Sequence, residues 1–269
     1  MESPSTTQVG WDRRRLLIGL AAVVLAAAVL ITGLAYAAYS TITSASDRSD
    51  SRALASGTPT AAGRAPGRDA IAGRPMLRVT PADARPTTPS AVTPAVFVVP
   101  AAVRTGPGGV PSGFPRTPAG AVAQLAAIET TVLQGMSIPQ TNDVYRRWAL
   151  PGGVGVAGWE LTRNVQAFLG TAEMSQAMNL ATVVATPAAA QVKGVDGDDW
   201  LVACVLLEVR ATITVESKMG YGYCERMQWH RGRWMIAPGA PAARAPSTWP
   251  GSDLSVRAGW RTWVDAGQE

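Results

Sequence analysis

An uncharged apolar run near the N-terminus constrains this 269-residue chain more than any other feature. From Leu16 to Tyr39 the sequence reads LLIGLAAVVLAAAVLITGLAYAAY. At about 1.5 Å rise per residue, a helix of this length spans a hydrocarbon core of roughly 30 Å. Residues 16–39 are therefore predicted to form a single transmembrane helix in contact with membrane lipid.

The charges beside this run predict its orientation. Arg13, Arg14 and Arg15 directly precede it, whereas Arg48 and Arg52, the first arginines after it, are mixed with aspartates. Positive residues favour the cytoplasmic side of a membrane. Residues 1–15 are therefore predicted to be a cytoplasmic tail of a cell-membrane protein, and the residues after Tyr39 are predicted to be extracellular. A cleaved export signal ending at Ala35-Tyr36-Ala37 is the alternative, although the run exceeds the usual signal core of about 7 to 15 residues.

Residues 40–116 are rich in Pro, Ala, Thr, Ser, Gly and Arg. Such a composition offers too little apolar surface to offset the entropy of ordering, so a disordered linker is predicted. Two short apolar pieces, Pro75 to Val79 and Ala95 to Val99, are the exceptions. They either belong to the spacer or dock as added strands on the domain or on a partner.

The net charge of +5 belongs to this linker. Residues 40–117 hold nine Arg against four Asp, whereas residues 118–269 hold twelve Lys plus Arg against thirteen acids. A nearly neutral domain is not expected to recognise a nucleic acid by its sequence, although weak attraction to lipid head groups, wall polymer or DNA backbone stays open.

The remaining residues, 117–269, are predicted to fold as one domain that begins with helices. Thr117 and Pro118 form an N-cap and a first helical residue, and apolar residues then recur at helical spacing until Gly135. Further helices are predicted over residues 139–149 and 157–169.

Strands are predicted to follow these helices. Residues 180–195 form a strand interrupted near Pro187, the Asp196-Gly197 turn follows, and apolar residues alternate from Val205 to Val215. A last pair runs from Tyr221 to Trp229 and returns after the Arg231-Gly232 turn. The predicted fold class is α+β, with helices packed on a curved antiparallel sheet.

The C-terminal end is predicted to form a helix. Ser252 is a typical N-cap, and Leu254, Trp260 and Trp263 follow it. Packing of this helix on the domain is the expectation, and a partner surface made of Trp260 and Trp263 is the alternative.

Cys204 and Cys224 lie at even positions of successive predicted strands, so their side chains leave the same face of the sheet. In an oxidising compartment a disulfide between them is expected. A hairpin centred near Ser217 and Lys218 would however place Cys204 opposite about residue 232, beyond the roughly 7 Å between Cα atoms that a disulfide allows. Two buried thiols are the alternative.

No catalytic set, cofactor site or metal site is recognised in the sequence. His230 is the one histidine, and Asp196, Asp198 and Asp199 lack the distant glutamate of a calcium loop. The glycine-rich stretch at 152–158 lacks the Lys-Ser/Thr pair of a phosphate loop. We therefore do not expect an enzyme, although a cone with a pocket lined by Trp159, Trp200, Tyr223 and Trp229 stays open.

Two motifs carry a family resemblance: GFPRTPAGAVAQLAAI at Gly113 to Ile128, and YCERMQWHRGRWMIAPG with APSTWPG between Tyr223 and Gly251. Together they resemble anchored envelope proteins of actinobacterial integrative and conjugative elements. Helices before a sheet that ends in W-x-x-G-R-W are similar to the cystatin-like cone, which also forms the exported domain of assembly subunits in conjugative type IV secretion.

This resemblance implies a membrane-anchored extracytoplasmic scaffold that binds other envelope or secretion-complex proteins and forms homo-oligomers. The alternatives are a ligand-binding or weakly catalytic cone, and an accessory protein of a lipid or substrate import system. An open pocket with converging polar groups favours a ligand-binding cone over a scaffold.

Overall fold

The computed structural model describes residues 67–171, 182–212 and 216–267, which belong to one compact unit that begins at Gly63. The helices are α2 (Arg68–Gly73), η1 (Pro81–Ala84), η2 (Pro107–Gly109), α3 (Pro118–Gly135), α4 (Ile138–Trp148), α5 (Gly155–Gly158), α6 (Glu160–Thr171) and α7 (Asp253–Arg257). The strands are β1 (Val96–Val99), β2 (Arg104–Thr105), β3 (Pro111–Ser112), β4 (Thr182–Val195), β5 (Trp200–Thr212), β6 (Glu216–His230), β7 (Arg233–Ile236) and β8 (Arg261–Asp265).

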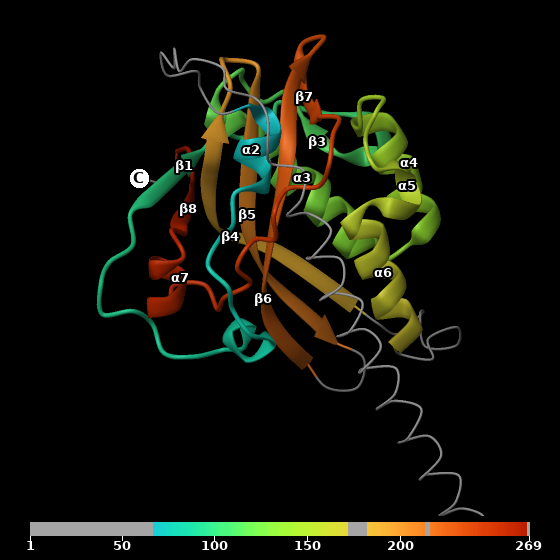
Figure 1. Cartoon of the computed structure of the whole chain (residues 1–269). Coiled ribbons are helices and arrows are strands. Elements are labelled where there is room, and N and C mark those ends of the chain that lie inside the picture. The colour runs from blue at the N-terminus through green and yellow to red at the C-terminus, as the bar shows by residue number, and fades with distance from the viewer. Residues whose placement is uncertain (1–66, 172–181, 213–215, 268–269) are drawn as a thin grey trace, which may run out of the picture. The chain divides into compact units, whose positions relative to one another are not determined.

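The predicted α+β class is confirmed. Six strands form one curled, mostly antiparallel half-barrel in the order β1-β8-β4-β5-β6-β7, in which only the β1–β8 pair is parallel. Figure 1 shows α3, α4 and α6 on one side of this sheet. Strands β2 and β3 form a separate small ladder.

The helix α3 begins where the sequence predicts it. The hydroxyl of Thr117 accepts a hydrogen bond from the amide of Gly120, and Pro118 occupies the first turn, where its missing N–H costs nothing. Ser137 caps α4 in the same way through the amide of Gln140. The predicted third helix begins slightly later than expected, because the single turn α5 precedes α6.

Strand β5 is buried on both faces, and this property organises the core. Its odd residues from Leu201 to Leu207 pack against the helices, together with Trp148, Trp159 and Trp234. Its even residues Trp200, Val202, Cys204 and Leu206 form a second apolar cluster on the opposite face. The strand predicted from Val205 onward therefore begins earlier, at Trp200, and its side chains point alternately into the two apolar clusters.

Residues 67–116 differ from the prediction of a disordered linker. Helix α2 packs Ile71 and Ala72 into the second cluster, and Lys193 Nζ donates to the carbonyl of Ala72 at 2.6 Å. The piece Ala95 to Val99 contains β1 and so takes the docking alternative, as an added strand beside β8. Phe97, Val99, Val110 and Phe114 pack into the first cluster, so the two apolar clusters together supply partners for the few apolar residues of this segment.

The C-terminal end also differs from the prediction. Helix α7 covers only residues 253–257, and residues 261–265 form β8, which inserts between β1 and β4. Tertiary pairing overrides the local helix signal because β4 and the separate strand β1 offer backbone partners on the two sides of this stretch. Trp260 is buried in the second cluster, and its indole N–H donates to the carbonyl of Pro246 at 3.0 Å.

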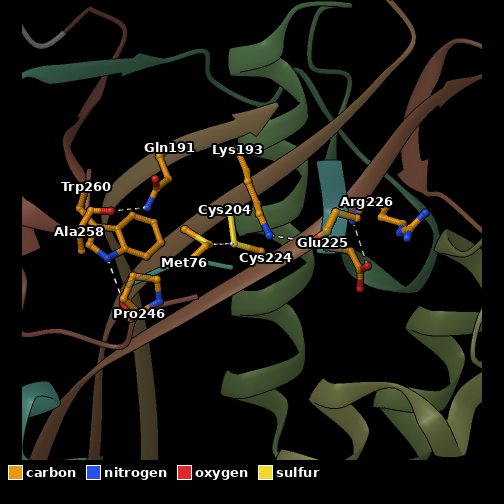
Figure 2. Close-up of a disulfide and its surroundings, with 11 residues drawn as sticks. Met76, Gln191, Lys193, Cys204, Cys224, Glu225, Arg226, Pro246, Ala258 and Trp260 are labelled. Atoms are coloured by element: carbon orange, nitrogen blue, oxygen red, sulfur yellow. Dashed lines mark hydrogen bonds between the residues drawn. A yellow bond between two sulfur atoms is a disulfide. The ribbon is translucent and has the colours of Figure 1, made fainter. Parts of the chain in front are cut away.

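The register of the β5–β6 hairpin settles the pairing of the cysteines. Thr212 pairs with Glu216, so the hairpin is centred between these two residues and not near Ser217 and Lys218, as predicted from the sequence. Cys204 is therefore directly opposite Cys224, the Cα atoms are 4.1 Å apart, and a disulfide joins them. Figure 2 shows this disulfide with Met76 against it, and Cys224 Sγ lies 3.5 Å from Met76 Sδ.

Among residues 67–171, 182–212 and 216–267, no helix is long and apolar enough to cross a bilayer. The predicted span at residues 16–39, the tail at 1–15 and the first part of the linker, 40–66, lie outside the described residues.

Candidate functional site

A large pocket lies between α6 and the part of β5 and β6 that curls away from it. Its volume is about 1010 Å³, and residues 75–81 and 243–247 complete its wall. The lining is mainly apolar and includes Met76, Leu77, Leu133, Met136, Phe168 and Val209. Such a volume is that of a binding site for a drug-sized or lipid-sized molecule.

Eight of the lining residues have polar side chains: Arg78, Thr80, Glu160, Asn164, Ser217, Tyr221, Arg244 and Ser247. The Asn164 side-chain amide donates to the Tyr221 hydroxyl at 2.7 Å, which fixes both groups. Burial raises the pKa of Tyr221 well above its usual value, and the carboxylates of Glu129 and Glu160 add to this shift. The phenol is therefore a neutral hydrogen-bonding group at physiological pH.

A buried carboxyl network lies beside the pocket. The Tyr223 hydroxyl donates to Glu225 Oε2 at 2.5 Å, and the Trp159 indole N–H is 3.0 Å from the Tyr223 oxygen and 3.1 Å from Glu225 Oε2. The amide of Arg226 donates to the other oxygen of Glu225 at 3.0 Å. Burial raises the pKa of Glu225, and these hydrogen bonds oppose that shift.

Among the described acids, Glu129 stands out because both of its carboxyl oxygens are buried without a hydrogen-bond partner. It lies on the sheet-facing side of α3, is fully buried, and neither carboxyl oxygen has a hydrogen-bond partner within the described structure. Burial raises its pKa well above the usual value, and the nearby Glu225 and Glu160 raise it further. A neutral, protonated carboxyl group is the form that such a site stabilises.

The predicted pocket residues divide between two faces of the sheet. Trp159 and Tyr223 are brought together and line a small pocket of about 20 Å³, which shares Glu160 with the large one. Trp200 lies in the second cluster on the opposite face, and Trp229 packs edge-on against Trp234. Trp200 and Trp229 therefore line neither of these two pockets.

The other predicted site residues have structural surroundings. Cys204 and Cys224 are buried in the second cluster, and Trp260 is buried there as well. The Trp263 indole N–H donates to Asp265 on the same strand. Trp260 is thus unavailable as a surface, and Trp263 is only partly accessible.

The acidic turn at residues 196–199 is used in ion pairs: Asp196 with Arg68 and Asp199 with Arg116, both at 2.6 Å. In the part of the chain that the structure describes, no group of three or more His, Cys, Asp or Glu residues is arranged to hold a metal ion.

Sequence reasoning missed Glu129, Glu160, Asn164 and Tyr221. A signal existed for Glu129, because this glutamate interrupts an otherwise apolar stretch of α3. The odd-numbered polar residues of β6, Tyr221, Tyr223 and Glu225, also share one face of the strand, and this face is the one that the helices cover. No family model, curated protein or solved structure matches this chain.

Proposed function

We propose that this protein is a membrane-anchored binding protein whose extracytoplasmic domain holds an elongated, mostly apolar ligand in the large pocket. The observation that carries the proposal is the 1010 Å³ pocket itself, which combines a mainly apolar lining with polar side chains that include Glu160, Asn164, Tyr221 and Arg244. A cone that served only as a scaffold has no need of such a cavity. Binding without catalysis is the simplest use of this arrangement.

The finer fold assignment is part of the same proposal. Three helices on the concave side of a curled sheet, with the chain returning through Trp229, Gly232 and Trp234, support a cystatin-like cone. Cones of this kind host ligand binders, enzymes and scaffolds, so the fold alone does not choose among them. The pocket favours the first.

The lining defines the chemistry of the ligand. Methionine, leucine and phenylalanine side chains favour an alkyl or ring system, and Met side chains adapt to irregular shapes. Tyr221 and Asn164 supply hydrogen bonds to one polar group of the ligand, and Arg244, which also lines the pocket, is a donor for an anionic group. An amphipathic molecule such as a lipid fits these requirements, in agreement with a role as an accessory of lipid or substrate import.

The test uses residues 63–269, which form a compact unit, expressed apart from the predicted anchor. Native mass spectrometry of this domain should detect a co-purified ligand. A fluorescent fatty acid should bind the emptied pocket, and the co-purified ligand should displace this probe. Ala211→Trp, which fills the pocket from β5, should weaken probe binding by about tenfold or more. Ala240→Trp, at an exposed position outside the pocket, is the matched control.

Unchanged probe affinity in the Ala211→Trp variant, with its fold intact by circular dichroism, would sink the proposal. A chain that binds no apolar probe at all would have the same consequence.

A second candidate function is an assembly subunit of a conjugative DNA-transfer or envelope secretion complex. The observation that favours it is strand β1, which forms one edge of the sheet and exposes the side chains of Val96 and Val98. An edge strand with exposed valines is a site for strand addition by a partner or by a second copy. Cross-linking in the host from position 98 should then capture an envelope protein or a homo-oligomer, and a monomer without cross-links would refute this role.

A further inference from the structure

A depression at one end of the sheet is lined by several positively charged side chains, although the domain as a whole is nearly neutral. Five arginines and one histidine line it, within a volume of about 470 Å³: Arg104, Arg146, Arg147, His230, Arg231 and Arg233. They come from β2, from the last turn of α4 and from the β6–β7 turn. These segments are distant in the sequence, so the cluster is a product of the tertiary fold.

Only part of this charge is compensated. Arg147 forms an ion pair with Asp143 at 2.7 Å, and Arg233 donates to the carbonyl of Arg147 while it stacks over the Trp148 ring at 4.8 Å. Arg104, Arg146 and Arg231 have no acidic partner within ion-pair distance among the described residues. Three exposed guanidinium groups that share one hollow repel each other unless an anion lies between them.

The geometry suits a phosphate group. Arginine presents several N–H donors in a planar fork that bonds the oxygens of phosphate two at a time, and several arginines around one hollow surround such an anion. Arg147 and Arg233 are held in place by Asp143 and Trp148, so part of the site is ordered before a ligand arrives. Pre-ordering lowers the entropic cost of binding.

The position of the depression indicates the source of the phosphate. Arg68, at the start of α2, contacts Asp196 in the β4–β5 turn, and the carbonyl of Asp199 in the same turn accepts from the amide of Trp229. Trp229 directly precedes His230 and Arg231. The chain therefore enters the domain at the end of the sheet that carries the depression, and Figure 1 shows α2 and the start of β7 at this end.

We propose that the arginine-lined depression binds the phosphate groups of anionic lipid head groups at the membrane surface. This proposal rests on the proposed anchor at residues 16–39, because only residues 40–66 then separate the bilayer from α2. At an upper limit of about 3.5 Å per residue the connection leaves the domain within reach of the surface. The attraction is electrostatic and weakens as salt screens it.

The experiment reconstitutes the full chain in nanodiscs of neutral phosphatidylcholine, or of the same lipid with about one third anionic phosphatidylglycerol. Hydrogen exchange followed by mass spectrometry reads the peptides that cover residues 144–151 and 228–236. Anionic discs should slow exchange in these peptides by about threefold or more relative to neutral discs, and about 0.5 M NaCl should remove the difference. Peptides from α3 should not change.

The test variant is Arg146→Ala with Arg231→Ala, which removes two exposed, unpaired cations and should abolish the protection. Arg163→Ala, an exposed arginine of α6 that does not line the depression, should retain it. Equal thermal midpoints for both variants exclude loss of the fold as the cause. Protection that persists in the double variant, or that is equal in neutral and anionic discs, overturns the proposal.

Two further arms separate this proposal from its alternatives. Co-purification with neutral discs tests only whether residues 16–39 anchor the chain. A chain without an anchor fails to co-purify, whereas a chain with an inactive depression co-purifies but shows no protection in anionic discs. A short DNA duplex added to chains in neutral discs tests whether the depression binds the phosphates of nucleic acid instead. Protection of the same peptides by DNA, without any by phosphatidylglycerol, would assign the depression to nucleic acid and refute the lipid assignment.

Discussion

At the scale of single residues, the unusual feature of this domain is the number of acids that it buries. Glu129 and Glu225 are both buried, yet their surroundings differ. Glu225 accepts hydrogen bonds from Tyr223, Trp159 and the backbone, whereas Glu129 has none within the described structure. A charged carboxylate is unfavourable at this buried position, so the fold favours the protonated form of Glu129. The stability of the domain should therefore depend on pH.

We expect the domain to lose stability as the pH rises, through Glu129. Burial raises the pKa of this carboxyl in the folded chain. An acid with a raised pKa contributes most below its unfolded value of about 4.3, and the contribution is lost as the pH climbs toward the folded value. The free energy of unfolding should fall from about pH 4.5 upward, by at most about 1.4 kcal/mol per pH unit for this group.

Glu129→Gln should flatten this slope, because the amide resembles the neutral acid and does not ionise. Urea unfolding of the domain between acidic and mildly basic pH measures it, and a smaller slope of the same sign should remain from Glu225. Glu216→Gln, on an exposed part of β6, is the control and should leave the profile unchanged. An identical slope in the Glu129→Gln variant would show that the acid is not protonated in the fold.

At the scale of elements, two glycines of β6 allow another segment of the chain to pack directly against the backbone of this strand. A Cβ atom at Gly220 would lie 1.9 Å from the carbonyl oxygen of Thr248, and one at Gly222 would lie 2.7 Å from that of Pro246. The proline-rich segment after β7 thus lies directly on the backbone of the strand. This close approach covers the second face of the sheet without the need for large side chains.

Gly220→Ala should therefore destabilise the domain by about 2 kcal/mol or more, because the backbone of residues 246–250 must move away from the strand. Chemical denaturation of residues 63–269 gives the value. Gly73→Ala, at the end of α2 with no atom near the added Cβ, should change the stability by less than about 0.5 kcal/mol or raise it slightly. Equal effects of the two substitutions would contradict this packing.

The disulfide acts at the same scale. It joins the middle of β5 to β6 on the face that α2 and Met76 cover. Residues 205–223 form the loop that it closes, and a cross-link over about 20 residues contributes roughly 3 kcal/mol in the chain-entropy account. Replacement of both cysteines by alanine should lower the free energy of unfolding by about this amount, and reduction of the native domain should reproduce the loss.

At the scale of the whole molecule, the sheet is a layer between two covers of different origin. The helices α3, α4 and α6 cover one face, and the other face is covered by α2, Met76 and residues 237–250. Arg226, which is almost fully buried on this second face, pairs with Asp69 of α2 at 2.7 Å. The arm at residues 67–90 is therefore part of the domain and one wall of the large pocket.

Removal of this arm should expose the second apolar cluster. A chain that begins at residue 91 should unfold at least about 5 °C lower than one that begins at residue 63, and it should bind a dye that detects exposed apolar surface. Differential scanning fluorimetry of the two chains gives the comparison. Similar midpoints and no dye binding would mean that the arm is a spacer, as its composition alone suggests.

The sequence by itself determined the elements whose signals are local. The Thr117-Pro118 cap, the helical spacing that ends at Gly135, and the Arg231-Gly232 turn all act within a few residues, so α3 and the β6–β7 hairpin were predictable. The α+β class followed from the order of these elements. The predicted membrane span, residues 16–39, depends on local apolarity in the same way and stays a prediction.

Only the tertiary structure decided the rest, because it depends on which surfaces meet. Contacts with the two apolar clusters made residues 67–116 part of the domain where a linker was predicted, and pairing with β1 and β4 made β8 from a stretch with a helix signal. The register of one hairpin aligned Cys204 with Cys224. The pocket, the buried acids and the arginine-lined depression each join side chains from separate segments, and no local pattern in a sequence encodes such distances.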